Sequence, residues 1–153
     1  MNDSIYRAPK GTRDILWPES ERWRTLIEIF SDVVGSAGYT QLVLPIFEHA
    51  EVFHRLGSST DVVSKEMYEF IDKGGRHIAL RPEQTASVVR SYSQHRPVLP
   101  WKVWYTGPNF RYERAQKGRF RQFDQVGVEA LGSDDPHLDA EIISLAWQFY
   151  ERL

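Results

Sequence analysis

Apolar side chains recur along the chain with spacings typical of regular secondary structure. Between residues 18 and 37 they return at every third or fourth position, which predicts an amphipathic helix that ends at Gly38. A short helix is expected near residues 49–56, and the helical spacing predicts two more helices over 84–94 and 137–152. The positions that we expect these helices to bury are Trp23, Leu26, Ile27, Phe30, Val33, Val34, Ala37, Ala86, Val89, Tyr92, Leu138, Ile142, Leu145, Ala146 and Phe149.

Stretches of β-prone residues lie between the predicted helices. The first covers residues 39–47 and contains Pro45, which restricts it to a strand end, a sheet edge or a subunit boundary. The next two, residues 67–72 and 76–81, flank Lys73-Gly74-Gly75, so they are expected to form a β-hairpin.

A second, longer hairpin is expected near the end of the chain. Residues 101–114 and 119–131 form its predicted strands, and residues 115–118 join them. Hairpins with helices interspersed predict a single α+β domain, in which helices flank a mainly antiparallel sheet.

Composition narrows the class of protein. The 153 residues are 41% hydrophobic and 13% aromatic, which is enough for one substantial core. No apolar run is long enough to cross a membrane and no signal peptide is evident, so we expect a cytoplasmic location. The chain has no cysteine and its five histidines lack metal-ligand spacing, so the residues predict no metal site. A net charge of −2 argues against a sequence-independent nucleic-acid binder.

Basic residues gather around the turn of the long hairpin, and alternation places most of its polar side chains on one face. Side chains of a regular strand point alternately to opposite sides of the sheet. One face is predicted to carry Arg111, Glu113, Arg119, Arg121, Phe123, Gln125, Gly127 and Glu129, and the other Phe110, Tyr112, Phe120, Gln122, Asp124, Val126 and Val128. The remaining basic residues of the turn are Arg114 and Lys117.

The order of groups along this face suits a nucleotide that lies next to an amino acid. Arginine binds phosphate oxygens through its planar fork, and Phe123 can stack on a base while Glu113 accepts from an exocyclic amine. Gln125 and Glu129 suit an ammonium group and N–H donors, with Gly127 opening space between them. A solvated hairpin explains the same pattern, since its cross-strand ion pairs would each contribute about 0.2–1 kcal/mol.

Five stretches of the sequence resemble a known family. Residues 110–113 (FRYE) and 118–123 (GRFRQF) are similar to motif 2 of class II aminoacyl-tRNA synthetases. Residues 10–14 (KGTRD), 44–48 (LPIFE) and 80–85 (LRPEQT) resemble histidyl-tRNA synthetases, and the likeness is collinear from about residue 9 to the C-terminus. The resemblance implies a class II synthetase core.

The resemblance also implies chemistry for individual residues. The family activates L-histidine with ATP and Mg²⁺ by in-line displacement at the α-phosphorus, transfers it to tRNA(His), and forms a homodimer through motif 1, where Pro45 lies. Arg111 would be the catalytic residue at the α-phosphate. The implied ATP-binding residues are Arg111, Glu113, Arg119, Arg121 and Phe123, and the implied histidine-binding residues are Glu83, Thr85, Gln125 and Glu129. Glu83 and Thr85 are equally explained as the N-terminus of a helix.

The sequence departs from the family pattern in two residues and in length. Gln84 stands where the family usually has glycine, and Asp124 where histidine is common. Motif 3 and the anticodon-binding domain would lie beyond residue 153, so residues 1–153 are interpreted as the N-terminal portion of a catalytic domain. We therefore expect the isolated segment to activate histidine weakly or not at all, and pyrophosphate exchange at a rate typical of full-length enzymes would refute this. The missing strands would leave an exposed sheet edge.

Two other functions fit parts of the sequence. The regulatory subunit of ATP phosphoribosyltransferase is a catalytically silent paralogue that senses histidine. It need not keep the ATP-binding residues, which are complete here, so ATP binding would separate it from a ligase. A stand-alone RNA-binding module built on the basic hairpin predicts a salt-sensitive RNA affinity that survives removal of Glu83 and Glu129.

Overall fold

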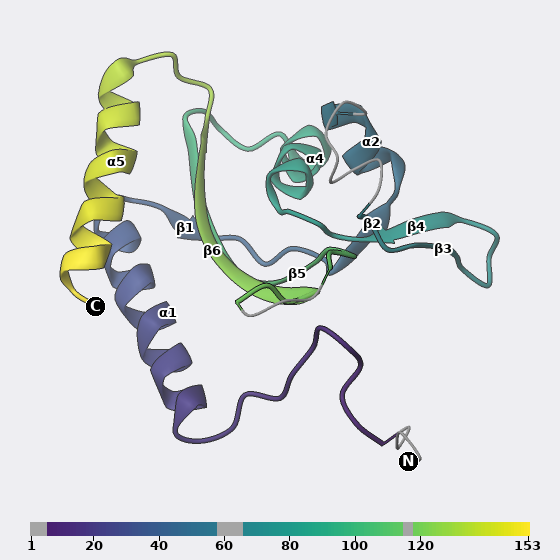
Figure 1. Cartoon of the computed structure of the whole chain (residues 1–153). Helices are drawn as coiled ribbons and strands as arrows, with labels where there is room; N and C mark the ends of the chain where they lie inside the picture. Colours follow the sequence, from purple (N-terminus) through teal and green to yellow (C-terminus); the bar gives the residue numbers. More distant parts are fainter. Residues whose placement is uncertain (1–5, 58–65, 115–117) are drawn as a thin grey trace.

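The computed structural model describes residues 6–57, 66–114 and 118–153, so most of the predicted turn at 115–118, including Lys117, lies outside the described residues. Figure 1 shows α1 and α5 side by side next to the curved hairpin β5–β6, with α4, α2 and a second small sheet on its other side. The helices are α1 (Glu19–Ser36), α2 (Glu51–Gly57), α4 (Thr85–His95) and α5 (Pro136–Glu151). The strands are β1 (Thr40–Gln41), β2 (Phe47–His49), β3 (Glu69–Ile71), β4 (His77–Leu80), β5 (Trp101–Phe110) and β6 (Gln122–Leu131). The predicted α+β class is confirmed.

The helices follow the predicted spacing closely where local signals mark their ends. Helix α1 buries Phe30, Val33 and Val34, and the chain leaves it through Gly38 in a left-handed conformation with φ of 84°. Helix α5 begins with Pro136 at its first position, and the carboxylate of Asp135 accepts a hydrogen bond from the backbone N–H of His137 at 2.9 Å.

Two of the expected core positions are wrong. Val89 of α4 is 39% exposed while the neighbouring Val88 is fully buried, so the inward face of this helix is rotated by one residue. Ala146 of α5 is also exposed, although Leu145 and Phe149 of the same helix are buried as expected. Periodicity alone could not fix the rotation of α4, because it is set by the strands on which the helix packs.

The predicted strand over residues 39–47 is wrong as a single strand. Its start, β1, pairs in parallel with β5, whereas its end, β2, pairs antiparallel with β4 in the second sheet. Pro45 lies in the crossing segment, which carries the chain from the sheet β1-β5-β6 to the sheet β2-β4-β3. A proline cannot donate to a sheet, so its place between Gln41 and Phe47, outside both strands, agrees with the expected restriction.

Arg81 joins the two sheets from inside the protein. Its side chain is 2% exposed and donates hydrogen bonds to the backbone oxygens of Leu44 at 3.1 Å, Pro45 at 3.2 Å and Pro108 at 2.8 Å. Burial lowers the pKa of Arg81. A side chain at Gly107 would come within 2.5 Å of the Arg81 guanidinium, so glycine is required where this cation crosses β5. Arg81 thus fixes the crossing segment against β5.

The hairpin β5–β6 is shorter than predicted but has the predicted faces. Strand β5 ends at Phe110 and β6 begins at Gln122, so the expected strands over 101–114 and 119–131 are too long. The side chains of Val126 and Val128 pack into the core against α1 and α5. Glu129 instead contacts Thr85 of α4, which confirms that alternate residues of β6 point to opposite sides. Strand β6 is an outer strand of the sheet β1-β5-β6.

Within the described residues, no helix is both long and apolar enough to cross a membrane.

Candidate functional site

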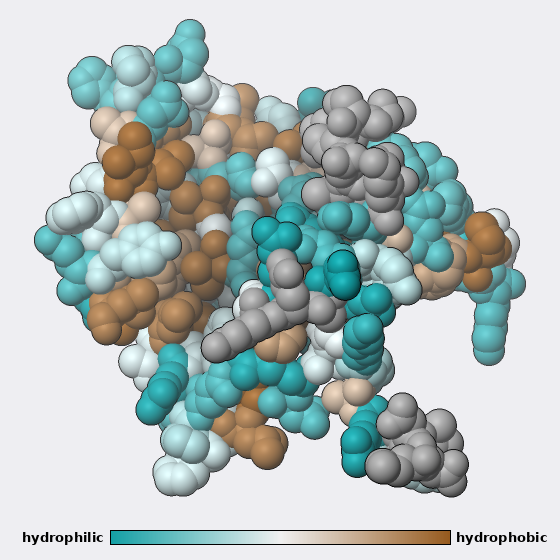
Figure 2. Space-filling model, viewed as in Figure 1, coloured by the Kyte–Doolittle hydropathy of each residue, from teal (hydrophilic) through white to brown (hydrophobic). Residues whose placement is uncertain are grey.

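A polar hollow lies at the loop end of the hairpin β5–β6, where Phe110 pairs with Gln122. Its volume is about 420 Å³, and Figure 2 shows hydrophilic residues gathered in this region, whereas hydrophobic residues gather over α1 and α5. The residues that line the hollow are Glu66, Arg111, Glu113, Gly118, Arg119, Phe120 and Phe123. Four of the residues predicted to bind ATP are therefore brought together here, and they are Arg111, Glu113, Arg119 and Phe123.

Arg111 is oriented by the backbone and by an aromatic ring. Its Nε donates to the carbonyl oxygen of Pro82 at 3.0 Å, and its guanidinium carbon lies 5.1 Å from the centre of the Phe123 ring. This hydrogen bond uses none of the Nη protons, which form the fork that suits phosphate oxygens. The cation and the ring are thus placed next to one another, as the alternation of β6 predicts.

Glu113 and Arg119 face one another across the hollow. The shortest distance between the guanidinium of Arg119 and the carboxylate of Glu113 is 3.6 Å, and the Arg119 side chain is 65% exposed. The Glu113 side chain is 22% exposed, but a pair with this long separation and one exposed partner is weak, so the two groups can be separated at small cost.

Further along the same face, Glu129 is the centre of a hydrogen-bonded cluster. Its Oε1 accepts from the hydroxyl of Thr85 at 2.6 Å and from that of Tyr105 at 3.3 Å. Burial raises the pKa of Tyr105, and the charge of Glu129 raises it further, so the phenol stays a donor. The second oxygen of Glu129 takes part in neither of these two hydrogen bonds. Thr85 and Glu129, predicted to share a site, are brought together.

The space that we expected Gly127 to open for a ligand is filled by the protein. A side chain at this position would lie 2.6 Å from the Tyr105 ring and its hydroxyl. Tyr105 stands opposite Gly127 in the β5–β6 register, and its ring crosses the glycine to reach Glu129. Gly127 therefore accommodates a tyrosine rather than a substrate.

Glu83 and Gln125 both use part of their polar groups within the protein. The carboxylate of Glu83 accepts from the backbone N–H of Ala86, at 3.0 and 3.3 Å, as expected for an acidic residue at a helix N-terminus. The side-chain oxygen of Gln125 accepts from Asn109 at 2.7 Å, and Asn109 is fully buried. The Gln125 amide nitrogen is left as the group that can meet a ligand.

The segment just before β6 departs from the predicted alternation. Phe120, expected on the opposite face, lines the hollow. Arg121 does not line it, because its guanidinium carbon lies 3.9 Å from the centre of the Tyr112 ring, and its Nε donates to the carbonyl oxygen of Glu113 at 3.3 Å. The reason is a contact with the N-terminal segment, since the backbone N–H groups of Arg121 and Gln122 both donate to the carbonyl oxygen of Gly11. This contact ends the regular strand.

Three residues of the site were missed by the sequence analysis. Glu66 lines the hollow and accepts from the backbone of Tyr112, but it follows a segment without periodic signal. Tyr105 and Asn109 lie on the β5 face that carries the site, where their parity with Arg111 could have indicated them.

Neither of the two residues that depart from the family pattern lines the hollow. Gln84 is 1% exposed, and its amide nitrogen lies 3.5 Å from the carbonyl oxygen of Gly107. Its φ of −114° and ψ of −18° are compatible with the start of α4. Asp124 is exposed and, as expected, has the parity of Val126, which faces α1 and α5.

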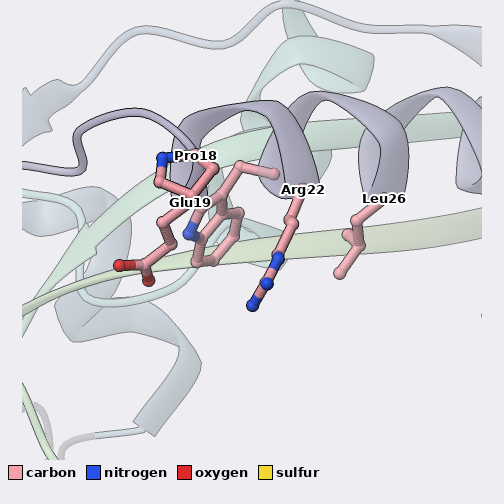
Figure 3. Close-up of a pocket in the computed structure, with 5 residues that line it drawn as sticks. Pro18, Glu19, Arg22 and Leu26 are labelled. Carbon is pink, nitrogen blue, oxygen red and sulfur yellow. The ribbon is translucent and has the colours of Figure 1, made fainter.

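Two other hollows lack the chemistry of a nucleotide site. One, of about 360 Å³, lies along α1, where Figure 3 shows Pro18, Glu19, Arg22 and Leu26 on one side of the helix. Glu19 already pairs with Arg13 at 2.6 Å. The other, of about 220 Å³, is an apolar cavity between α1, α5 and β6. In the described parts of the chain, no group of three or more His, Cys, Asp and Glu residues is arranged to hold a metal ion.

Two small sheets, one of which contains an antiparallel hairpin with arginines at its loop end, form part of the core fold of a class II aminoacyl-tRNA synthetase. Within that class, the chain belongs to the histidyl-tRNA synthetase family, whose model, described as Histidyl-tRNA synthetase, matches residues 11–153. The resemblance noted in the motifs is thereby confirmed.

Known proteins agree with this assignment. The chain is 53% identical over 152 residues to the histidine–tRNA ligase of Listeria innocua, covering 96% of this chain and 36% of that protein. The crystal structure of apo S. aureus histidyl-tRNA synthetase is similar with a TM-score of 0.80 at 39% identity, over 97% of this chain and 35% of that one. A Bacillus halodurans structure titled ATP phosphoribosyltransferase regulatory subunit/histidyl-tRNA synthetase has a TM-score of 0.83 at 24% identity, over 97% of this chain and 38% of that one, which shows the fold alone. The chain spans about a third of the length of these relatives.

Proposed function

We propose that residues 1–153 are the N-terminal portion of the catalytic domain of a histidine–tRNA ligase. The complete enzyme would activate L-histidine with ATP and transfer it to tRNA(His), and Mg²⁺ would arrive bound to the ATP phosphates. The observation that carries this proposal is the placement of Arg111, Phe123, Gln125 and Glu129 on one face of a single hairpin. A cytoplasmic location follows from the proposed role in protein synthesis.

At the nucleotide end of this face, the side chains would bind and polarise ATP. Phe123 offers a stacking surface for adenine, and Glu113 an acceptor for its exocyclic amine. The fork of Arg111 would hold the α-phosphate and stabilise the charge that develops as the histidine carboxylate attacks it, while Arg119 would contact the outer phosphates. Catalysis would then depend on positioning and on fixed cations, and it needs no protein nucleophile.

At the other end of the face, polar side chains would bind histidine. Glu129 accepts from Thr85 and Tyr105 through one oxygen, so its orientation is fixed before a ligand arrives. Its second oxygen can take an imidazole N–H. Glu83, Thr85 and Gln125 would surround the α-ammonium group, with Glu83 supplying the negative charge.

We also propose a homodimer through the segment that contains Pro45. Three apolar side chains around this proline are exposed, with relative exposures of 84% for Val43, 45% for Ile46 and 57% for Phe47. An exposed apolar group of this size supports an interface between subunits.

Glu129→Ala tests the histidine end in the full-length gene product. The substitution removes one charged hydrogen bond to the imidazole, worth about 1.5–3 kcal/mol, so histidine should bind about 10- to 150-fold more weakly while ATP affinity changes little. Steady-state pyrophosphate exchange with each substrate varied in turn would measure both effects. Glu141→Ala is the matched control. Glu141 lies on α5, across the sheet from the site, and pairs with Lys102 of β5. An equal loss for both substrates would mean that Glu129 is only part of the scaffold.

The alternative function, the regulatory subunit of ATP phosphoribosyltransferase, is not favoured. The relative with 53% identity is named as a ligase, and the proposed ATP-binding residues Arg111, Glu113, Arg119 and Phe123 meet in one hollow. Saturable ATP binding that depends on Arg111 would support the ligase.

A further inference from the structure

We propose that the N-terminal segment at Gly11–Arg13 supports the ATP site, and that Arg121 is a positioning residue rather than a phosphate ligand. This inference rests on the proposed function of the hollow. In Figure 1 the N-terminal segment runs as an extended chain toward α1, below the loop end of β5–β6. Hydrogen bonds join the two regions directly, although more than a hundred residues separate them in the sequence.

The carbonyl oxygen of Gly11 fixes the backbone at the entry to β6. It accepts from the N–H of Arg121 at 2.7 Å and from that of Gln122 at 3.1 Å. The carbonyl of Arg121 in turn accepts from the N–H of Arg111 at 2.8 Å, so the support reaches the proposed catalytic residue through two successive hydrogen bonds. Displacing Gly11 would therefore displace the backbone that carries Arg111.

Gly11 is the residue type that this contact requires. Its φ of 85° lies in the left-handed region, and a Cβ at this position would lie 2.6 to 2.8 Å from the Cβ, Cγ and Cδ of Arg121. Rotation of the Arg121 side chain could move its Cγ and Cδ away, but the Cβ, 2.8 Å away, cannot move without the backbone. Any other residue at position 11 would separate the two segments.

The Arg121 side chain holds the loop that carries Glu113. Its guanidinium carbon lies 3.9 Å from the centre of the Tyr112 ring, and its Nε donates to the carbonyl oxygen of Glu113 at 3.3 Å. The ring of Tyr112 packs edge-on against Tyr68, and its backbone N–H donates to Glu66. Arg121 therefore acts on the hollow through Glu113 and Tyr112 rather than by lining it.

Arg13 supports the other side of the hollow. It makes two hydrogen bonds to the carboxylate of Glu19, at 2.6 and 3.0 Å, and its guanidinium carbon lies 5.1 Å from the centre of the Phe120 ring. Glu19 belongs to the first turn of α1 and Phe120 lines the hollow. Arg13 thus connects a rigid helix to one wall of the proposed ATP site.

Gly11→Ala in the full-length gene product tests the support. It should weaken the binding of ATP and of AMP by similar factors of about tenfold or more, since the two hydrogen bonds to Gly11 are strained, and change histidine affinity less than about twofold. Gly75→Ala is the matched control for backbone strain, because Gly75 has a φ of 77° but open space around it. Isothermal titration calorimetry measures the affinity of the protein for ATP, for AMP and for histidine. Unchanged nucleotide affinity in Gly11→Ala would overturn the proposal.

Arg121→Gln separates positioning from direct phosphate binding, and it also serves if Gly11→Ala does not fold. If Arg121 is a positioning residue, the variant should lose equal affinity for ATP and for AMP. If Arg121 binds the outer phosphates, only the affinity for ATP should fall, and that result would overturn the proposal. Hydrogen–deuterium exchange provides a readout that needs no nucleotide. Gly11→Ala should speed exchange at the amides of Arg111, Arg121 and Gln122, and unchanged exchange would contradict the support. If the wild-type protein binds no ATP, the proposed function fails, and the exchange result still decides whether the support exists.

Discussion

Replacing Arg111 with alanine is expected to lower the rate of histidyl-adenylate formation by about 10²- to 10³-fold, the usual effect of removing one preorganised group that stabilises developing charge. The guanidinium is already aligned by Pro82 and Phe123, so little reorganisation is needed when the α-phosphate is attacked. Because this interaction strengthens in the transition state, the loss should appear mainly in kcat rather than in KM for ATP. Pyrophosphate exchange on the full-length gene product measures both constants.

Two further variants sharpen the test of Arg111. Arg111→Lys keeps the charge but loses the planar fork, so it should recover only part of the rate. Arg76→Ala is the control, since Arg76 pairs with Asp72 at the β3–β4 turn, away from the hollow. A variant Arg111→Ala whose KM for ATP rises while kcat is unchanged would show that Arg111 binds ATP without stabilising the transition state.

Replacing Arg81 with methionine should destabilise the fold by about 3–5 kcal/mol, because each buried acceptor that loses its partner costs about 1–3 kcal/mol. Three backbone oxygens, those of Leu44, Pro45 and Pro108, accept from this side chain. Methionine has a similar length, so the packing loss is small and the hydrogen bonds dominate. Urea denaturation followed by circular dichroism measures the difference in the free energy of unfolding.

The matched control for Arg81 is Arg24→Met. Arg24 is an exposed residue of α1 that pairs with Glu21 and Glu28 in its own helix, so its loss should barely move the unfolding midpoint. If Arg81→Met and Arg24→Met unfold at the same urea concentration, the buried arginine does not hold the two sheets together.

Local signals explain which parts of the fold could be predicted. Helix α1 ends just before Gly38, and helix α5 begins just after Asp135. A left-handed glycine and a capping carboxylate both act within a few residues of themselves. The single strand expected over residues 39–47 is wrong because its two halves pair with different partners, which no local pattern encodes. The rotation of α4 that buries Val88 is likewise fixed by packing.

In the candidate site too, local patterns predicted some placements and missed those set by distant contacts. Alternation along β6 correctly placed Phe123 and Glu129 on one face, because that strand is regular from Gln122 onward. It failed at Phe120, where the N-terminal segment takes up the backbone N–H groups of the next two residues. A contact so distant in sequence leaves no mark on the local pattern.

The most direct test is a crystal structure of the full-length gene product with a non-hydrolysable histidyl-adenylate analogue bound. It would show whether the analogue lies on the β5–β6 face. We expect the adenine on Phe123, the α-phosphate surrogate against the fork of Arg111, and the imidazole within hydrogen-bonding distance of the second carboxylate oxygen of Glu129. An analogue seated away from the β5–β6 face, or one whose imidazole points away from Glu129, would contradict the assignment of this face as the site of histidine activation.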